Sequence, residues 1–322
     1  MAFSFKKLIS AAIAAGCLAS PALADEVKLR AVSAFQLGTV FYEPFERFVD
    51  RVNEKGKGIV QIEVLGGPDA MPPFELGNAL RSGIVDMANT TAVYHANLVP
   101  EGLAMTLTNR SMAELRENGG YELLDKLHRE KAGIHWLGRL TENVNYYIYL
   151  SKASEPVDFS SLKVRSAPVY QAFFSALGIT PVQMPAGEVF TALERGAVDG
   201  YAWPALGVFD LGWQEKTGAR IDPGFFQVET GVYFSQSSWA KLTEEQRNFL
   251  NEQMLSIEAE AGRYEKLAED EFERQAGAGI KTITLTGDDA EAFNTLAAEE
   301  GWKPIIAASP EHGPKLRELL AK

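Results

Sequence analysis

The sequence predicts an α/β fold built as two lobes, with a ligand cleft between the lobes and a long helix that spans both. Segments with strand character alternate with amphipathic helical segments along the chain, which is typical of sheets covered by helices. One segment occurs twice at a long separation, and one helical segment is too long for a single lobe. A length of 322 residues also favours two domains.

The first residues have the features of a secretory signal peptide. Lys6 and Lys7 precede an apolar run, and Pro21 is followed by Ala-Leu-Ala, a small-residue cleavage signal. Residues 1–24 are therefore expected to be removed on export, and the apolar run is too short for a membrane span. The alternative is lipoprotein processing at Cys17. If this one cysteine leaves with the signal, the mature chain has no disulfide and no cysteine-ligated metal.

Strand and helix patterns then follow one another in order. Residues 27–35 and 59–67 have strand character and flank an amphipathic helical segment at 41–56. A helix after Tyr121 leads to two further apolar strands, "IHWLGRL" and "NYYIYLS". This alternation predicts mainly parallel sheets, whose ligands bind at the carboxyl ends of the strands.

The repeated segment supports the two lobes. "MPPFELGNALRSGIVDM" (71–87) and "MPAGEVFTALERGAVDG" (184–200) share methionine, proline, glutamate, alanine, leucine, glycine, valine and aspartate at the same places, without a gap. Each copy reads as a proline-initiated helix, a glycine at the helix end and a buried strand. Chance similarity between two helix–strand units is the alternative.

The long helical segment runs from Thr243 to about Ala276 without a proline. A capping box at "TEEQ" begins it and Gly277 ends it. A helix of this length would extend roughly 50 Å at about 1.5 Å per residue, so it is expected to lie across both lobes. A coiled coil is the rival interpretation, but small Ala261 and Ala268 interrupt its apolar stripe.

Composition and motifs argue against several classes of function. The formal net charge is −12 and no polybasic tract is present, which excludes nucleic acid as a partner. The four histidines show no metal-ligand spacing, and the sequence has no nucleophile elbow, P-loop or dinucleotide-binding loop. We therefore expect no catalysis, no cofactor and no metal site.

Arg165 is the strongest candidate binding residue. It ends the short strand in "LKVRSAP", just before Pro168 stops the backbone. A guanidinium fixed at a strand end beside a cleft can hold a carboxylate through two parallel hydrogen bonds. An exposed arginine on an edge strand is the alternative.

The stretch "LKVRSAPVYQAFFSALGITPVQMPAGEVFTALERGAVDG" closely resembles the central signature of TRAP-transporter solute-binding proteins, the extracytoplasmic receptors of tripartite ATP-independent periplasmic transporters. The resemblance covers essentially the mature chain. It implies a periplasmic, two-lobed protein that closes on an organic acid and delivers it to the TRAP membrane permease subunits. The protein itself is expected not to span the membrane and to be a monomer.

The resemblance also assigns residues. Arg165 occupies the family's carboxylate-binding position, Arg139 fits a second arginine position, and Trp203 stands where a branch that binds 2-oxoacids has tryptophan. That branch places glutamate before the tryptophan as part of a cation site, whereas this chain has Ala202, so a bound metal is not expected. Further candidates at or beyond strand ends are Phe35, Gln36, Tyr94, Asn145, Tyr146, Tyr147, Phe209 and Trp213. If several of the aromatic residues line the cleft, the ligand is a monocarboxylate with an apolar or aromatic body; Trp203 packed under its turn is the alternative.

The lobes are expected to be discontinuous in sequence. One takes residues 25–142 and 231–270, and the other takes 143–230 and 271–322. Alternatives to the TRAP receptor are a binding protein for an ABC importer or a sensor kinase and, from another class, an exported hydrolase.

Overall fold

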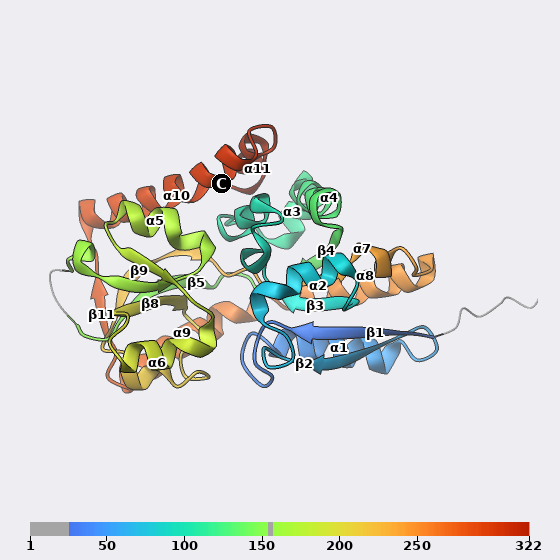
Figure 1. Ribbon diagram of the computed structural model, residues 1–322, viewed down its shortest axis with the longest axis horizontal. Helices are drawn as coiled ribbons and strands as arrows, with labels where there is room; N and C mark the ends of the chain where they lie inside the picture. Colours follow the sequence, from blue (N-terminus) through green and yellow to red (C-terminus); the bar gives the residue numbers. More distant parts are fainter. Residues whose placement is uncertain (1–25, 154–156, 322) are drawn as a thin grey trace, which may run out of the picture.

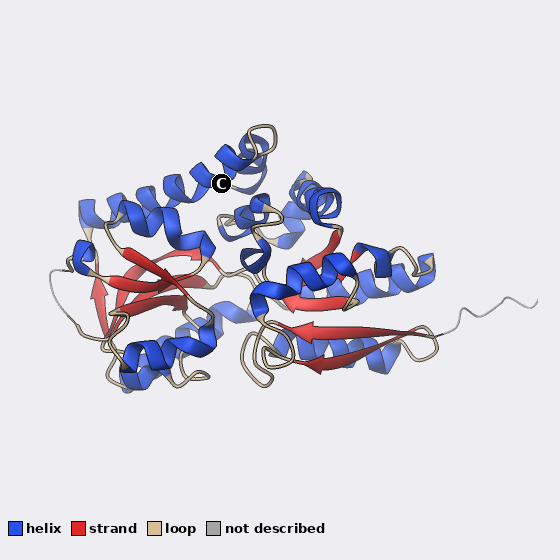
Figure 2. Cartoon of the chain, viewed as in Figure 1, coloured by secondary structure: helices blue, strands red, loops and turns tan. Residues whose placement is uncertain are grey.

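The computed structural model describes residues 26–153 and 157–321. The expected signal peptide lies outside the described residues. Two sheets lie side by side along the long axis of the molecule, each with helices against it (Figures 1 and 2). The two-lobed α/β architecture expected from the sequence is therefore present.

The first sheet has the strand order β2-β1-β3-β10-β4. Its strands are β1 (Val27–Ser33), β2 (Val60–Gly66), β3 (Met87–Thr90), β4 (Ile134–Arg139) and β10 (Gly231–Ser235). The helices on this side are α1 (Glu43–Lys55), α2 (Leu76–Ser82), α3 (Met112–Asn118), α4 (Gly120–Ala132), α7 (Gln236–Trp239) and α8 (Glu244–Glu258), with the 3₁₀ turns η1 (Pro73–Glu75), η2 (Ala92–His95) and η3 (Pro100–Thr106). The helix α1 packs as its sequence pattern predicts, because Phe45, Phe48 and Val52 form a buried stripe on one face.

The second sheet has the order β11-β9-β5-β8-β6-β7. Its strands are β5 (Asn145–Leu150), β6 (Lys163–Ser166), β7 (Thr180–Gln183), β8 (Gly200–Pro204), β9 (Ala219–Gln227) and β11 (Lys281–Thr284). Its helices are α5 (Gln171–Ala176), α6 (Val189–Glu194) and α9 (Arg263–Gly277), with η4 (Phe159–Ser161), η5 (Pro168–Tyr170), η6 (Ala186–Glu188) and η7 (Trp213–Lys216). The strands of the first sheet thus come from residues 27–139 and 231–235, and those of the second from residues 145–227 and 281–284.

Both sheets are mixed, not purely parallel. In the first, β10 runs antiparallel to β3 and β4; in the second, β5 runs antiparallel to β8 and β9. The chain leaves the first lobe through β4 into β5 and returns through β9 into β10. The outgoing and returning strands lie side by side in each sheet, β4 with β10 and β5 with β9, and therefore run antiparallel.

These two direct connections join the lobes, and they run next to each other. Residues 140–144 link β4 to β5, and residues 228–230 link β9 to β10. The nitrogen of Leu140 donates to the carbonyl of Thr230 at 2.7 Å, and the Thr141 and Thr230 hydroxyls are 3.1 Å apart. The nitrogen of Val228 donates to the carbonyl of Val144 at 2.8 Å. The paired connections form a short, narrow link where relative rotation of the lobes can occur.

The repeated segments have the same local structure. Each begins with a 3₁₀ turn, η1 or η6, that continues into a short helix, α2 or α6. Gly83 and Gly196 then adopt left-handed backbone conformations, with φ of 71° and 66°, before the chain enters β3 or β8. Both glycines are therefore required by the backbone, as the sequence predicted.

The helix expected to run unbroken from Thr243 to about Ala276 is instead two helices, α8 and α9. Residues 259–262 between them form turns; the nitrogens of Glu260 and Ala261 bond to carbonyls three residues back. Gly262 weakens the helix at this point, and Arg51 of α1 holds the Glu260 side chain at 2.8 Å. The pair of helices still extends over both sheets, with the turn near the boundary (Figure 1).

A second helical bridge was not recognised from the sequence. The helix α10 (Gly287–Ala308) contacts α5 and β9 of the second lobe and η3 of the first, and α11 (Gly313–Leu320) contacts α3 and α4. The two helices extend along one side of the molecule over both lobes (Figure 1). Pro304 lies inside α10, although a proline within a helix removes one of its backbone hydrogen bonds. The C-terminal helix α11 thus packs on first-lobe helices, although the sequence-based division gave residues 271–322 to the second lobe.

Candidate ligand-binding site

Two adjoining cavities lie between the lobes. The outer one has a volume of about 370 Å³ and the inner one about 30 Å³. Four aromatic side chains line both: Phe35, Phe41, Tyr94 and Trp203. The first three come from the segments after β1 and β3, and Trp203 comes from β8. The cavities therefore form one site, in which an aromatic collar separates a small inner chamber from a larger outer one.

Arg165 lies at the inner chamber. Its position in β6 is fixed by pairing with Val182 of β7 and Tyr201 of β8. The guanidinium is 1% exposed; Nε donates to the carbonyl of Met184 at 3.1 Å, and Nη1 donates to the carbonyl of Ala202 at 3.2 Å. The third nitrogen, Nη2, has no acceptor at hydrogen-bond distance among the described residues. The hydroxyl of Tyr94 is a nearby group that interacts with this guanidinium. A buried cationic donor left unpaired carries a large free-energy penalty, so this atom marks a place for an anionic acceptor.

Three tyrosines lie close to this guanidinium. Burial raises the pKa of Tyr94, Tyr146 and Tyr170, and the positive charge of Arg165 opposes the rise in each case. All three phenols therefore stay protonated at neutral pH and can donate hydrogen bonds. Tyr94 belongs to η2 of the first lobe, whereas Tyr146, Tyr170 and Arg165 belong to the second. Polar groups from both lobes thus converge on one small chamber.

Glu229 is the acidic group of the inner chamber, and the sequence did not single it out. It lies in the 228–230 connection, is fully buried, and accepts hydrogen bonds from the Thr91 hydroxyl, the Ala92 nitrogen and the Tyr233 hydroxyl at 2.8–2.9 Å. Burial raises its pKa, while these three donors and the charge of Arg139 oppose the rise. Glu229 therefore ties the connection between the lobes to the floor of the site.

Trp203 has both a binding face and a packing face. Its ring centroid lies 5.4 Å from the Arg165 guanidinium carbon, and its ring meets Trp213 at 4.8 Å and Phe41 at 6.2 Å, both edge-on. It is 7% exposed, and its indole nitrogen has no partner in the part of the chain that the structure describes. Trp203 is thus partly a core residue, as the alternative held, and also a wall of both cavities.

The outer chamber is walled by the repeated segments and their neighbouring loops. Pro72 and Pro73 from the first copy lie on one side, and residues 185–188 from the second copy lie on the other. Gln36, a predicted site residue, also lines this chamber. Its charged residues are Asp69, Glu188 and Asp210, all exposed side chains on loops or turns, which carry no periodic sequence signal.

Two predicted residues lie elsewhere. Arg139 lines neither cavity: its Nη2 donates to the carbonyl of Arg110 at 2.9 Å and lies 3.0 Å from the Glu142 carboxylate. Asn145 begins β5 and lines a separate surface hollow of about 210 Å³ beside Phe226 and Trp302. Neither residue is brought next to Arg165 in this conformation.

Of the remaining aromatic candidates, one lines a cavity and three are packed inside the second lobe. Tyr146 lines the inner chamber. Tyr147 packs edge-on to Phe272 of α9, Phe209 lies under Arg274, and Trp213 lies behind Trp203 and Tyr201. Tyr147, Phe209 and Trp213 therefore belong to the packing of the second lobe.

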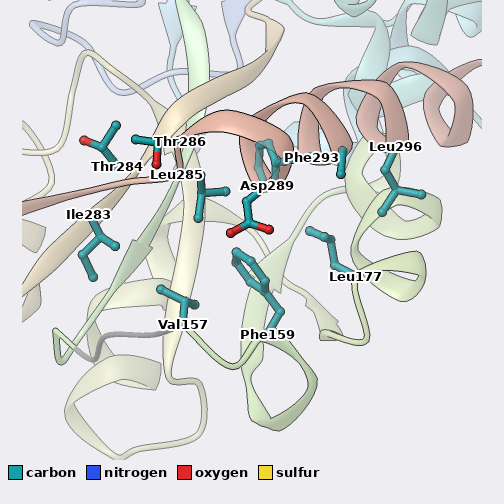
Figure 3. A pocket seen from close by; sticks show the side chains of 11 residues that line it. Val157, Phe159, Leu177, Ile283, Thr284, Leu285, Thr286, Asp289, Phe293 and Leu296 are labelled. Carbon is teal, nitrogen blue, oxygen red and sulfur yellow. The ribbon is translucent and has the colours of Figure 1, made fainter.

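A larger hollow of about 740 Å³ lies on the second lobe alone, between η4 and α10 (Figure 3). Its walls are mostly apolar, with Asp289 as the single charged side chain among the lining residues. Since one lobe forms all of its walls, a ligand there would gain nothing from closure of the lobes. Within residues 26–153 and 157–321, no group of three or more histidine, cysteine or acidic side chains could hold a metal ion, and no helix is long and apolar enough to cross a membrane.

The fold is that of solute-binding proteins with two lobes. A TRAP periplasmic solute-binding protein from Desulfovibrio salexigens, solved with orotic acid, superposes with a TM-score of 0.80 over 91% of this chain and 97% of its own, at 18% identity. A second TRAP periplasmic solute-binding protein, from Roseobacter denitrificans and solved with L-galactonate, superposes with a TM-score of 0.77. The match covers 92% of this chain and 99% of its own, at 20% identity.

The family follows from sequence as well. The profile of the bacterial extracellular solute-binding proteins, family 7 (DctP), matches residues 33–307, so the chain belongs to this family. A curated relative, a monocarboxylate 2-oxoacid-binding periplasmic protein of Nostoc, is 22% identical over 269 residues, which cover 78% of this chain and 72% of the relative. The family suggested by the "LKVRSAP" signature is thereby confirmed.

Proposed function

We propose that the protein is a receptor that captures an organic acid between its lobes and delivers it to a TRAP-type membrane permease. The observation that carries this is the unpartnered Nη2 of Arg165, buried in an interlobe chamber beside three tyrosines. A chamber of about 30 Å³ has room for little more than a carboxylate group. The carboxylate enters the inner chamber, and the rest of the molecule occupies the outer one.

Closure of the lobes gives the receptor its affinity. Arg165 and Trp203 come from the second lobe, and Phe35, Gln36 and Tyr94 from the first, so a ligand that touches both sets stabilises the closed form over the open one. The guanidinium of Arg165 and the protonated phenols around it are groups that hold an anion, which supports ligand binding and transport.

Orotic acid and L-galactonate, bound by the two structural neighbours, both carry a carboxylate, which supports an organic acid as ligand here. The signal peptide expected at residues 1–24 and the extracellular solute-binding family support a periplasmic location and delivery to a permease. That the receptor acts as a monomer stays a prediction. Arg139 and Asn145 lie outside the two cavities. We propose that Arg139 acts through its charge on Glu229, and Asn145 through the 140–144 connection that it follows.

A thermal-shift screen against organic acids tests the proposal. A ligand at 100 times its Kd adds about 2.7 kcal/mol to the free energy of unfolding, a readily measured rise in melting temperature. We expect carboxylates to give the largest shifts, and the shifts to be clearly smaller in Arg165→Lys. Hits confined to uncharged compounds, or turnover of the bound acid on prolonged incubation, would contradict a carboxylate receptor.

A further inference from the structure

The charged groups around the site are strongly unequal in sign. Arg165 is the one basic residue among those that line the two cavities, whereas Asp69, Glu188, Asp210 and Glu229 are acidic. The single guanidinium is already needed for one carboxylate. A second negative group on the ligand would therefore face three carboxylates in the outer chamber and no cation.

The charges are also ordered along the site. Arg165 and Glu229 lie at the inner chamber, the aromatic collar follows, and the three exposed acids lie at the outer chamber. A ligand anchored by its carboxylate on Arg165 places its body within the collar and its far end among the acids. The faces of aromatic rings attract cations, best of all a tryptophan, so the collar favours a positive far end as well.

The acids come from both lobes. Asp69 lies in the loop before η1 of the first lobe, and Glu188 and Asp210 lie in the second. Closing the cleft brings these like charges toward one another, which costs free energy unless a cation lies between them. A cationic ligand therefore favours the closed state twice, by its own contacts and by relieving this repulsion.

We propose, on the basis of the function proposed above, that the ligand is a cationic monocarboxylate: one carboxylate held by Arg165 and an ammonium or quaternary ammonium group facing Asp69, Glu188 and Asp210. The aromatic collar favours an apolar body over a hydroxyl-rich sugar acid, and the acidic outer chamber disfavours a dicarboxylate. The class includes betaine-like and amino-acid-like compounds with an apolar body short enough for a chamber of about 370 Å³.

Three probes of matched shape separate charge from size. The first is a trimethylammonio carboxylate; the second has carbon in place of the quaternary nitrogen; the third is the dicarboxylate of the same length. Each is titrated calorimetrically into the full mature protein over a range of chain lengths. We expect the cationic probe to bind about tenfold tighter than its neutral isostere, from cation–π and charge contacts together, and the dicarboxylate to bind most weakly.

Variants locate the cation. Glu188→Gln and Asp69→Asn should each weaken the cationic probe by about two- to fivefold, the size of an exposed ion pair, and leave the neutral isostere unchanged. Glu63→Gln is the matched control, because Glu63 is exposed on β2 and lines neither cavity. Added salt should weaken the cationic probe more than the neutral one.

The outcomes distinguish this inference from the function on which it rests. If the neutral isostere or the dicarboxylate binds as tightly as the cationic probe and Arg165→Lys weakens all three, the carboxylate receptor stands and the cationic ligand is refuted. If Arg165→Lys changes nothing, the proposed function fails at its anchor. Binding by no member of the series at millimolar concentration also overturns the inference, and native mass spectrometry for a copurified acid then tests the receptor separately.

Discussion

Asp210 accepts a hydrogen bond from the backbone nitrogen of Val40 at 2.8 Å, across the mouth of the cleft. Val40 follows β1 in the first lobe, and Asp210 follows β8 in the second. The bond therefore closes the site on the side away from the paired connections at 140–144 and 228–230. It forms only when the lobes are together, so its free energy bears on the closed state alone.

Replacing Asp210 should speed ligand release. Asp210→Ala removes a charge-assisted hydrogen bond, and a loss of about 0.5–1.5 kcal/mol corresponds to a two- to tenfold faster dissociation. Asp210→Asn keeps an oxygen acceptor and should fall between the parent and Asp210→Ala. Stopped-flow tryptophan fluorescence measures the rate. Equal rates for Asp210→Ala and the parent would show that this bond does not hold the closed state.

Arg165→Lys should weaken carboxylate binding by roughly ten- to a hundredfold although the charge is kept, because one ammonium cannot replace the planar fork. Arg220→Lys is a suitable control: Arg220 is buried in the same sheet and bonds to Gln275, away from the cavities. It should lower the melting temperature and leave the affinity unchanged. Calorimetry with the identified acid measures both variants, and equal affinity for Arg165→Lys and the parent would refute the anchor.

Ligand binding should change the fluorescence of Trp203. Its ring lines both chambers, so Trp203→Phe should remove most of the ligand-induced change and weaken binding, since a smaller ring buries less apolar area. Trp239 lies against His135 and Phe234 in the first lobe, and Trp239→Phe should keep the change. If Trp203→Phe retains both signal and affinity, Trp203 serves packing only.

Acid should destabilise the protein through two buried histidines. His95 and His128 lie with ring centroids 5.5 Å apart, and burial lowers the pKa of both, that of His95 well below its usual value. Unfolded histidine titrates near about 6.5. Below that pH the unfolded chain therefore binds more protons than the folded one, and the free energy of unfolding falls as pH falls; above it the contribution is constant.

Between about pH 7.5 and 5.5 the two histidines together should lower the free energy of unfolding by roughly 1–3 kcal/mol. Urea titrations at a series of pH values measure this slope. His95→Leu should make it shallower, because it removes one of the two groups that take up a proton on unfolding. The same slope in His95→Leu and the parent would assign the acid sensitivity to other groups.

Two glycines should respond in opposite directions to alanine. Gly262 has ordinary helical angles, φ −58° and ψ −19°, and an added Cβ meets nothing within 4 Å. Gly262→Ala should therefore stabilise the fold by about 0.4–1 kcal/mol. Gly196 also has free space but a φ of 66°, so Gly196→Ala should destabilise it by about 1–2 kcal/mol. The midpoints of denaturant unfolding measure both changes in stability. A loss of stability in Gly262→Ala would show that the turn between α8 and α9 needs glycine.

The sequence predicted the two lobes, the repeat and the strand-end position of Arg165, because each has a local signal. Glycines at fixed offsets marked the left-handed positions at Gly83 and Gly196, and the alternation of strands and helices marked the sheets. The break at residues 259–262 escaped prediction because it depends on a tertiary contact, the pair of Arg51 with Glu260. The sequence does contain one residue that disfavours a helix here, Gly262, but a single glycine is not enough to predict a break.

Only some of the residues named from the sequence lie at the two cavities, and their role in binding stays a prediction. Phe35, Gln36, Tyr94 and Trp203 do line the cavities that contain Arg165. Arg139 does not, because Glu142 three residues later pairs with it; that spacing was visible in the sequence but its geometry was not. Asp69, Glu188 and Asp210 lie in loops and turns, where only the folded chain shows which residues face one another.

The position of β10 affects how the chain acquires its structure. This strand lies between β3 and β4, inside the first sheet, yet it is made after all of β5 to β9. The amino-terminal half therefore leaves the ribosome with two strand edges exposed and a gap where β10 belongs, and its sheet closes only when residues 231–235 arrive. Such long-range closure is slow compared with local helix formation. A nascent chain of this topology stays incompletely folded until most of its length has been synthesised, and the unpaired edges of β3 and β4 are open to wrong pairing in the interval.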